Sequence, residues 1–459
     1  MPDIQRDQRK HALVIGGSLA GLLAARVLAN HFEQVTLIER DAFPDGPTHR
    51  SGVPQARHLH VLLLKGKAIF ERYFPGFEQE LLARGAVAAD AGDEFLTVSI
   101  FGRIAPVRIG MQMLLCSRYL IEWCVRRRLE AYKNIRILSR AEVTGLLAQD
   151  NNQQVGGVQL RPRGDEPLAE TLAAGLVVDC SGRGSDAPEW LTGMGYPRPE
   201  TTVVNSHLGY ATRRYRQPAQ ALPWKGVIIA VNPPDNPRGG GLFPAEGGQW
   251  IVTLAGMAGI YPPTDEAGFL EFAGQLSDPT IYNAIRQAEP ISQVFGYRRT
   301  ENRWRRYERL KSWPGGFLVM GDAACCFNPI YGQGMTTAAL GAALLDEFIQ
   351  SEEGDFTTRF GQIFQGKLAK LLETPWLMAT NEDFRWENTE GVRPGPAARF
   401  LQKYFDRVIK LACRDARAGR AYIEVAHLLQ PPASLFRPRI LIPALMPGSV
   451  DPDRQIPND

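Results

Sequence analysis

Two glycine-rich segments of the sequence could hold an anionic ligand. The first, Gly16–Gly21 (GGSLAG), lies between the apolar runs Ala12–Ile15 and Val35–Ile38, and Glu39 closes the second run. A dinucleotide pyrophosphate needs backbone N–H groups, a helix N-terminus behind them and no side chain in between. An acid about 20 residues further on can accept hydrogen bonds from ribose hydroxyls. The segment therefore predicts a dinucleotide-binding turn, although Ser18 replaces the middle glycine of the usual motif.

The second segment follows the apolar run Phe317–Met320. It begins with Gly321-Asp322, continues through Pro329 and Gly332-Gln-Gly334, and leads into an alanine-rich stretch over 335–349. A strand, an acid, a glycine-rich turn and a helix again form a geometry that receives anions, because a helix N-terminus favours negative charge. An ordinary glycine-rich connection is the structural alternative.

Several predicted elements position these segments. We expect a strand–turn–helix–strand unit at the N-terminus and a helix over 118–133 that begins at Arg118. Strands are then expected at 135–138, 143–148, 155–160 and 176–179, followed by a third glycine-rich turn at 181–185. Between 205 and 303 the runs 210–215, 226–231, 250–255 and 291–299 indicate an antiparallel sheet, with a hairpin turn at Gly247-Gly248.

Composition limits the class of protein. The chain has 459 residues, of which 44% are hydrophobic and 22% charged, with a net charge of +3. These values exclude a disordered or fibrous chain and give no indication of nucleic-acid binding. Six cysteines lack metal-ligand spacing and indicate reduced thiols in a cytoplasmic protein. The apolar stretch 11–29 contains four mid-segment Gly or Ser residues and Arg26, so a membrane span is not expected.

The segment 43–60 reads as a polar loop. It contains Arg57, His58 and His60, and the two histidines would share a face of a strand. A metal site needs a third ligand, and none has a suitable spacing, so we expect no metal here. A polar loop over the bound dinucleotide is the preferred interpretation. For Arg57, a surface ion pair is the structural alternative to a functional role.

Together, Gly16–Gly21, Arg118 after Cys116-Ser117, and Gly321-Asp322 with Pro329 and Gly332-Gln-Gly334 resemble the group A FAD-dependent monooxygenases of the hydroxybenzoate-hydroxylase fold. The chain is most similar to the flavin epoxidases of polyether biosynthesis, of the lasalocid and monensin type. That similarity rests on the segments 41–47, 52–58, 182–185, 250–253 and 327–332. Ser181-Gly182 replaces an Asp-Gly pair linked to FAD and NAD(P)H, Cys325 replaces a common histidine, and the Trp-x-Trp-x-Ile-Pro signature of flavin halogenases is absent.

The resemblance implies an α/β fold: a Rossmann-like FAD-binding domain of the glutathione-reductase type (10–60, 105–204 and 300–350), an interleaved antiparallel-sheet substrate domain (61–104 and 205–299) and a C-terminal helical region (351–459). It places Glu39 on the adenosine ribose, Arg118 on the pyrophosphate, Asp322 on the ribityl chain or pyrophosphate, and Pro329 beside the isoalloxazine. The implied cofactor-binding residues are Gly16, Gly17, Ser18, Ala20, Gly21, Glu39, Arg40, Arg118, Gly321, Asp322, Gly332, Gly334 and Met335, and the catalytic candidates are Arg57, His58 and Pro329.

The activity that the resemblance implies is insertion of one oxygen atom from O2, through a flavin C4a-hydroperoxide, into an apolar biosynthetic intermediate by epoxidation or hydroxylation. NAD(P)H would be the electron donor, with a separate flavin reductase as a possible partner. Orientation over the flavin suffices for an alkene, whereas a phenol needs a base. No acid–base pair stands out in 205–303, which favours an alkene or another electron-rich apolar substrate. A flavin-dependent reductase or dehydrogenase of prenyl-type double bonds and a non-catalytic FAD-binding protein remain the alternatives.

Overall fold

The computed structural model describes residues 9–164, 170–351 and 356–446. Its centre is a five-stranded parallel sheet in the order β19-β11-β1-β2-β7. All five strands of this sheet were expected from their short apolar runs. Nearly all side chains of β1, β2, β11 and β19 are buried, as expected for a parallel sheet covered on both faces, whereas the edge strand β7 is only partly buried. The bounds are β1 His11–Ile15, β2 Gln34–Ile38, β7 Ile135–Leu138, β11 Leu176–Asp179 and β19 Phe317–Val319.

Helices from distant parts of the chain pack beside this sheet. Helix α2 (Leu19–Leu28) follows the first glycine turn and contacts α9 (Gly334–Ser351), which follows the last one. Helix α3 (Leu64–Tyr73) contacts both, and α5 (Arg118–Leu129) contacts α2. Ser117 caps α5 by accepting a hydrogen bond from the Leu120 N–H. Both glycine turns therefore lead into helices that lie against each other.

The second large element is a seven-stranded sheet in the order β17-β13-β16-β15-β14-β4-β5, antiparallel except for the parallel pair β14–β4. The predicted hairpin at Gly247-Gly248 joins β15 to β16, and both glycines have positive φ. The strand expected over 291–299 is confirmed only over Phe295–Tyr297, because Tyr215 bridges Pro290 where regular pairing would place Ser292 opposite it. The other bounds are β4 Phe95–Ser99, β5 Gly102–Arg103, β13 Gly209–Arg216, β14 Gly226–Ile229, β15 Arg238–Ala245 and β16 Gln249–Gly256.

Smaller sheets and helices accompany the two large sheets. Segment 61–104 contacts both parts of the fold, since α3 packs on helices beside the parallel sheet whereas β4 pairs with β14 of the seven-stranded sheet. The remaining strands are β3 Val87–Asp90, β6 Gln112–Leu115, β8 Ala141–Gln149, β9 Gln154–Pro162, β10 Thr171–Ala173, β12 Thr201–Val204, β18 Asn302–Arg305 and β20 Cys325–Cys326. The remaining helices before residue 350 are α4 Phe77–Ala83, α6 Ala187–Gly193, α7 Glu266–Gly274 and α8 Thr280–Ile285.

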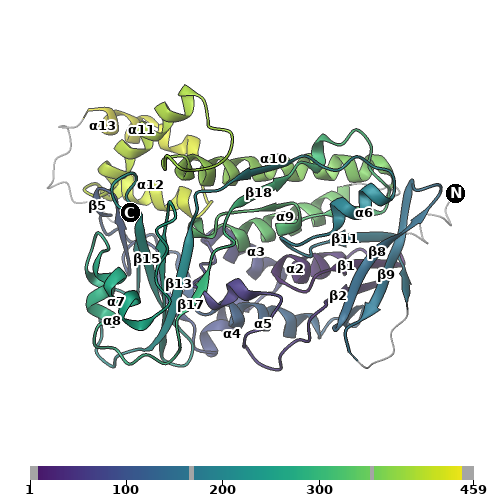
Figure 1. The fold of residues 1–459 in the computed structure, drawn as a ribbon, viewed down its shortest axis with the longest axis horizontal. Coiled ribbons are helices and arrows are strands. Elements are labelled where there is room, and N and C mark those ends of the chain that lie inside the picture. The colour runs from purple at the N-terminus through teal and green to yellow at the C-terminus, as the bar shows by residue number, and fades with distance from the viewer. Residues whose placement is uncertain (1–8, 165–169, 352–355, 447–459) are drawn as a thin grey trace.

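The C-terminal part of the chain is helical. The long helix α10 (Thr358–Asp383) lies along α9, and α11 (Pro396–Ala412), α12 (Ala416–Ala426) and α13 (Pro438–Leu445) gather above the antiparallel sheet (Figure 1). Within the described ranges, none of the helices combines the length and the apolar character that a membrane crossing would need. The fold is thus α/β, with a parallel-sheet domain, an antiparallel sheet and a helical C-terminal region.

Candidate functional site

The turn between β1 and α2 has the geometry that a pyrophosphate requires. Gly16 has φ +99°, and a Cβ built on it would lie 2.6 Å from the Cys180 carbonyl oxygen. A Cβ on Gly21 would overlap the Gly16 carbonyl oxygen, so the helix can pack closely only with glycine there. The Gly17 N–H donates to Glu39 Oε2 at 2.8 Å. The turn and the acid at the end of β2 therefore lie together.

Ser18, which replaces the middle glycine, is linked to helix α5. Its Oγ accepts from Arg118 Nη2 at 2.7 Å and donates to Glu122 Oε2 at 3.2 Å. Arg118 Nη1 in turn lies 2.9 Å from the same carboxylate oxygen. The Ser18 hydroxyl thus binds two side chains of α5, and Arg118, the first residue of that helix, lies beside the glycine turn.

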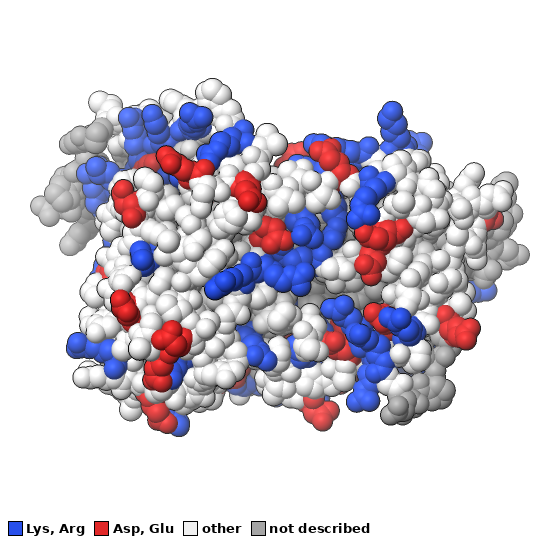
Figure 2. Space-filling model, viewed as in Figure 1, with Lys and Arg blue, Asp and Glu red and all other residues white. Residues whose placement is uncertain are grey.

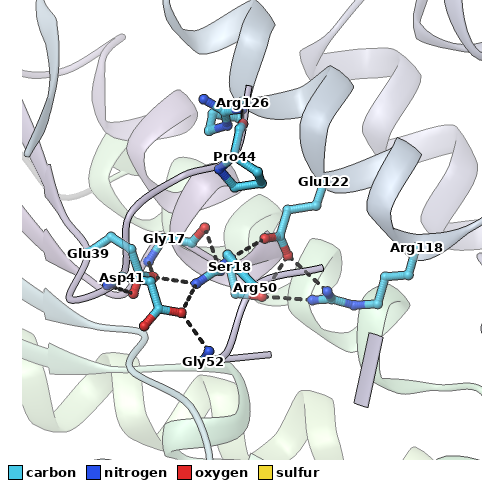
Figure 3. Close-up of polar contacts among 10 residues, drawn as sticks. All are labelled: Gly17, Ser18, Glu39, Asp41, Pro44, Arg50, Gly52, Arg118, Glu122 and Arg126. Atoms are coloured by element: carbon cyan, nitrogen blue, oxygen red, sulfur yellow. Dashed lines mark hydrogen bonds and ion pairs between the residues drawn. The ribbon is translucent and has the colours of Figure 1, made fainter. Parts of the chain in front are cut away.

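Arg50 is the centre of a buried ionic network around this turn (Figure 3). Its guanidinium lies 2.9 Å from Glu122, 3.2 Å from Glu39 and 3.3 Å from Asp41. It also donates to the Gly17 carbonyl oxygen at 3.2 Å. Arg50 is 8% exposed and Glu39 6% exposed, so solvent screens these contacts little. The network holds the glycine turn, the end of β2 and helix α5 in one arrangement.

Electrostatics favour the charged forms of this network. Burial alone would lower the pKa of Arg50, but Glu122 and Glu39 outweigh it and raise that pKa. For Glu122 the signs are reversed. Burial alone would raise its pKa, but the nearby cations Arg118 and Arg50 outweigh burial, so the pKa of Glu122 is lowered. Sequence reasoning missed both Arg50 and Glu122. The only local signal was the i, i+4 spacing of Arg118 and Glu122 on one helix.

The second glycine-rich segment, which begins at Gly321, faces the same region from the end of β19. Gly321 has φ +63°, and Asp322 follows it at the carboxyl end of the parallel sheet, where open α/β sheets bind ligands. Burial raises the pKa of the Asp322 carboxyl, and Arg183 and Arg118 partly offset that rise. Gly332 has φ +65°, and Gly334 begins α9 with open space where a Cβ would stand.

One cavity of about 1140 Å³ joins these segments to the antiparallel sheet and to the C-terminal helices. Around a hollow in the middle of the face shown in Figure 2, basic side chains gather. Gly17, Gly21 and Gly321 shape the turns behind the wall and do not line the cavity. The predicted residues that line it are Gly16, Ser18, Ala20, Glu39, Arg40, Arg118, Asp322, Pro329, Gly332, Gly334 and Met335.

Arg57 and His58 lie outside that lining. Arg57 stacks over the Phe295 ring at 4.5 Å. His58 is 4% exposed, and its Nδ1 lies 2.7 Å from the Thr212 hydroxyl, which contacts the Thr253 hydroxyl at 2.6 Å. Burial, with a smaller contribution from Arg57, lowers the pKa of His58 to about 4, so the imidazole is neutral at pH 7. His58 is therefore hydrogen-bonded to the antiparallel sheet through Thr212. Thr212 in turn contacts Thr253, which lines the cavity.

Asp383, at the end of α10, is a site residue that the sequence did not reveal. It is fully buried and accepts hydrogen bonds from Asn302 (2.5 Å), Asn328 (2.9 Å) and the Tyr331 hydroxyl (2.8 Å). Burial raises its pKa to about 6, although these donors lower it. Asn328 and Tyr331 flank Pro329, so Asp383 fixes the turn that carries this residue to the cavity. No sequence spacing connects these positions.

The residues present fit FAD. Gly182, Gly184 and Gly334 all line the cavity, and a Cβ on any of them would meet no protein atom within 4 Å, so backbone is open to a ligand there. Glu39 offers a buried carboxylate for ribose hydroxyls, Arg118 a cation for phosphate, and the start of α9 backbone N–H groups. The donor set and the open backbone match a dinucleotide that lies across the edge of the parallel sheet.

Comparison with known proteins finds a relative by sequence and related folds among solved structures. Protein Rv3254 of Mycobacterium tuberculosis is 34% identical over 377 residues, which cover 81% of this chain and 79% of that protein. The crystal structure of p-nitrophenol 4-monooxygenase PnpA from Pseudomonas putida DLL-E4 has 17% identity and a TM-score of 0.61, covering 92% of this chain and 98% of that one. That of a flavoprotein/dehydrogenase from Cytophaga hutchinsonii has 15% identity and a TM-score of 0.64, covering 94% and 95%.

These solved structures show that the fold is shared, and the sequence match is more specific. Residues 9–349, which include all three glycine-rich segments, Arg50 and Arg118, match the family described as FAD binding domain. The match spans most of the chain and covers every segment that forms the cofactor side of the cavity. The chain therefore belongs to the FAD binding domain family.

Proposed function

We propose that the protein is an FAD-dependent monooxygenase that inserts one oxygen atom of O2 into an apolar small molecule, by epoxidation or hydroxylation. The observation that carries the proposal is the single cavity, in which the cofactor turns on one side face an apolar sheet wall on the other. Membership of the FAD binding domain family supports the cofactor, and the fold shared with p-nitrophenol 4-monooxygenase supports the reaction class.

The proposed cofactor contacts follow the geometry of the cavity. Glu39 would bind the adenosine ribose, Arg118 the pyrophosphate and Asp322 the ribityl hydroxyls. Pro329 would contact the flavin, and the N–H groups at the start of α9 would stabilise negative charge on it. Reduced FAD supplies the electrons that activate O2, and NAD(P)H is the proposed source of those electrons.

The sheet side of the cavity supplies the substrate wall. Ile228, Val231 and Ala255 line it, and Phe327 adds apolar surface beside the Pro329 turn. Such a wall orients an apolar molecule and excludes water, which oxygen transfer requires. We propose that Arg57 and His58 act from behind this wall. Their contacts with Phe295 and with Thr212 fix β17 and β13, rather than touching the substrate.

An oxygen-isotope experiment tests the proposal. The FAD-loaded protein is incubated under ¹⁸O2 with NADH or NADPH and a panel of polyenes, isoprenoids and indoles, and products are analysed by mass spectrometry. Gain of one ¹⁸O atom is the expected result. A parallel arm adds a flavin reductase, because a donor could act through a separate protein. If the substrate gains or loses two hydrogens and no oxygen, the protein is a flavin-dependent reductase or dehydrogenase instead. The Cytophaga hutchinsonii protein of the same fold is described as a flavoprotein/dehydrogenase.

The Gly16→Val variant is the matched control. It places a side chain against the Cys180 carbonyl oxygen and should carry no FAD, so any oxygenated product that persists with it comes from a contaminant. If neither nicotinamide reduces the flavin and no product forms in either arm, a non-catalytic FAD-binding protein is the remaining reading and the proposal fails.

A further inference from the structure

The end of helix α10 carries two adjacent acids with different environments. Asp383 is fully buried in its network with Asn302, Asn328 and Tyr331. Glu382 lines the cavity, and 40% of its side-chain surface is accessible. Neighbouring side chains on a helix point about 100° apart, so one turn can place one acid in the interior and the next on the cavity wall.

Glu382 belongs to a continuous helical face on the cavity. The residues of α10 and its end that line the cavity follow 3–4-residue spacing, which places them on one side of the helix. They are Thr374, Leu377, Met378, Asn381, Glu382 and Arg385. Leu377 is 56% exposed although it is apolar, so this face offers apolar surface to a ligand. Phe405 and Ile409 of α11 line the same region.

At this end of the cavity two carboxyl groups share one cation. Arg385 lies 2.8 Å from Glu382 and 2.8 Å from Asp406 of α11, so one guanidinium serves two carboxylates. The carbonyl end of α10 adds to the negative potential. Glu382 directly precedes Asp383, which accepts a hydrogen bond from the Tyr331 hydroxyl at 2.8 Å, so this end of α10 lies beside the turn that carries Pro329.

We propose that Glu382 binds a hydrogen-bond donor, a hydroxyl or an amine, on an otherwise apolar substrate. The inference rests on the proposed function, since it takes this cavity as the substrate site. A carboxylate accepts a hydrogen bond more strongly than a neutral acceptor does, and a ligand without a donor leaves that carboxylate desolvated and unpaired. The alternative role is structural: Glu382 would only help Arg385 to hold α11.

Ligand titrations separate the two roles. The probes are 4-nonylphenol, 4-nonylaniline and 4-nonylanisole, which share an apolar body and differ in whether the polar group can donate. Binding to the FAD-loaded protein is followed by the change in flavin absorbance, without NAD(P)H. The wild type should bind the phenol and the aniline about tenfold more tightly than the anisole, as expected for one hydrogen bond to a charged acceptor. The phenol and aniline arms show which donor the site prefers.

The variant is Glu382→Gln, which keeps the shape and leaves Arg385 paired with Asp406. It should lose most of the preference for the donors while anisole affinity stays within about twofold, a change below half a kcal/mol. The matched control is Glu373→Gln, an exposed acid on the same helix that should change none of the three constants.

Three results would overturn the inference: equal affinity of the wild type for phenol and anisole, an equal loss of all three ligands in Glu382→Gln, or no binding of any probe. A lower melting temperature in Glu382→Gln with unchanged ligand preference would assign the structural role instead. Failure of the proposed function is distinguishable, because these titrations need no turnover. A donor preference that vanishes in Glu382→Gln would stand even if no ¹⁸O were ever incorporated.

Discussion

Replacing Arg50 by methionine should destabilise the protein and weaken FAD binding together. Methionine fills a similar volume without charge, so the variant removes the cation that Glu39, Asp41 and Glu122 share at 2.9–3.3 Å. Arg118 still pairs with Glu122 at 2.9 Å, but Asp41 and Glu39 keep only backbone N–H donors among their described contacts. The change therefore leaves buried carboxylates without a counter-ion.

The expected loss of folding free energy follows from these unpaired carboxylates. Breaking a buried ion pair from one side costs about 3–5 kcal/mol, because the remaining charge stays desolvated. Arg50 is 8% exposed, so screening reduces this value little. Loss of the hydrogen bond to the Gly17 carbonyl oxygen also loosens the pyrophosphate turn. We expect the FAD dissociation constant to rise about tenfold, as for one lost charge-assisted hydrogen bond.

Urea denaturation of the apo forms and FAD titration measure the two effects. Arg50→Lys is the control that keeps the charge but cannot span three carboxylates, and its losses should be intermediate. In a double-mutant cycle with Glu122→Gln, the double variant should lose less unfolding free energy than the two single variants lose together. Additivity within about 0.5 kcal/mol, or a loss below about 1 kcal/mol for Arg50→Met, would refute the reasoning.

The same variant has a pH signature. The folded pKa of Glu122 lies below its ordinary 4.5, so its contribution to stability is present above pH 4.5 and is lost as pH falls through the folded pKa. Arg50→Met removes part of that lowering. Its stability should therefore fall less steeply than that of the wild type below pH 4.5.

The other predictions concern single positions. Gly16→Val should purify without FAD, and full FAD occupancy would contradict the pyrophosphate assignment. Asp322→Asn should bind FAD more weakly and Asp322→Ala more weakly still, whereas lost stability with unchanged dissociation constants would reduce Asp322 to a structural turn residue. The pKa of His58 is about 4 in the folded protein, below its ordinary value of 6.5, so its contribution to stability is present above pH 6.5 and is lost as pH falls to 4. Over that range the free energy of unfolding of the wild type should fall by about 3 kcal/mol relative to that of His58→Gln, as measured by urea denaturation. Asp383→Ala leaves three donors without their acceptor and should cost at least about 2 kcal/mol while shifting the flavin absorbance, and an unchanged spectrum would separate Asp383 from the Pro329 turn.

Local sequence was sufficient for the elements whose signals are contiguous. The turn at Gly16, the strand before it and the acid after the next strand lie within thirty residues, and each is specified by backbone sterics or apolar runs. The hairpin at Gly247-Gly248 was predictable for the same reason, since its positive φ angles demand glycine. The strand over 291–299 was predicted too long because a two-residue irregularity opposite Tyr215 leaves no trace in the apolar pattern.

Only tertiary structure could bring together the polar groups that hold the site. Arg50 and Glu122 are 72 residues apart, Asn328 and Asp383 are 55 apart, and His58 and Thr212 are 154 apart. A buried charge or carboxylate has no periodic signature, because its partner is chosen by packing of whole elements and not by spacing along the chain. The sequence of this protein thus determined the glycine turns, whereas the fold decided which ions fix those turns and that Glu382 lines the cavity while Asp383 does not.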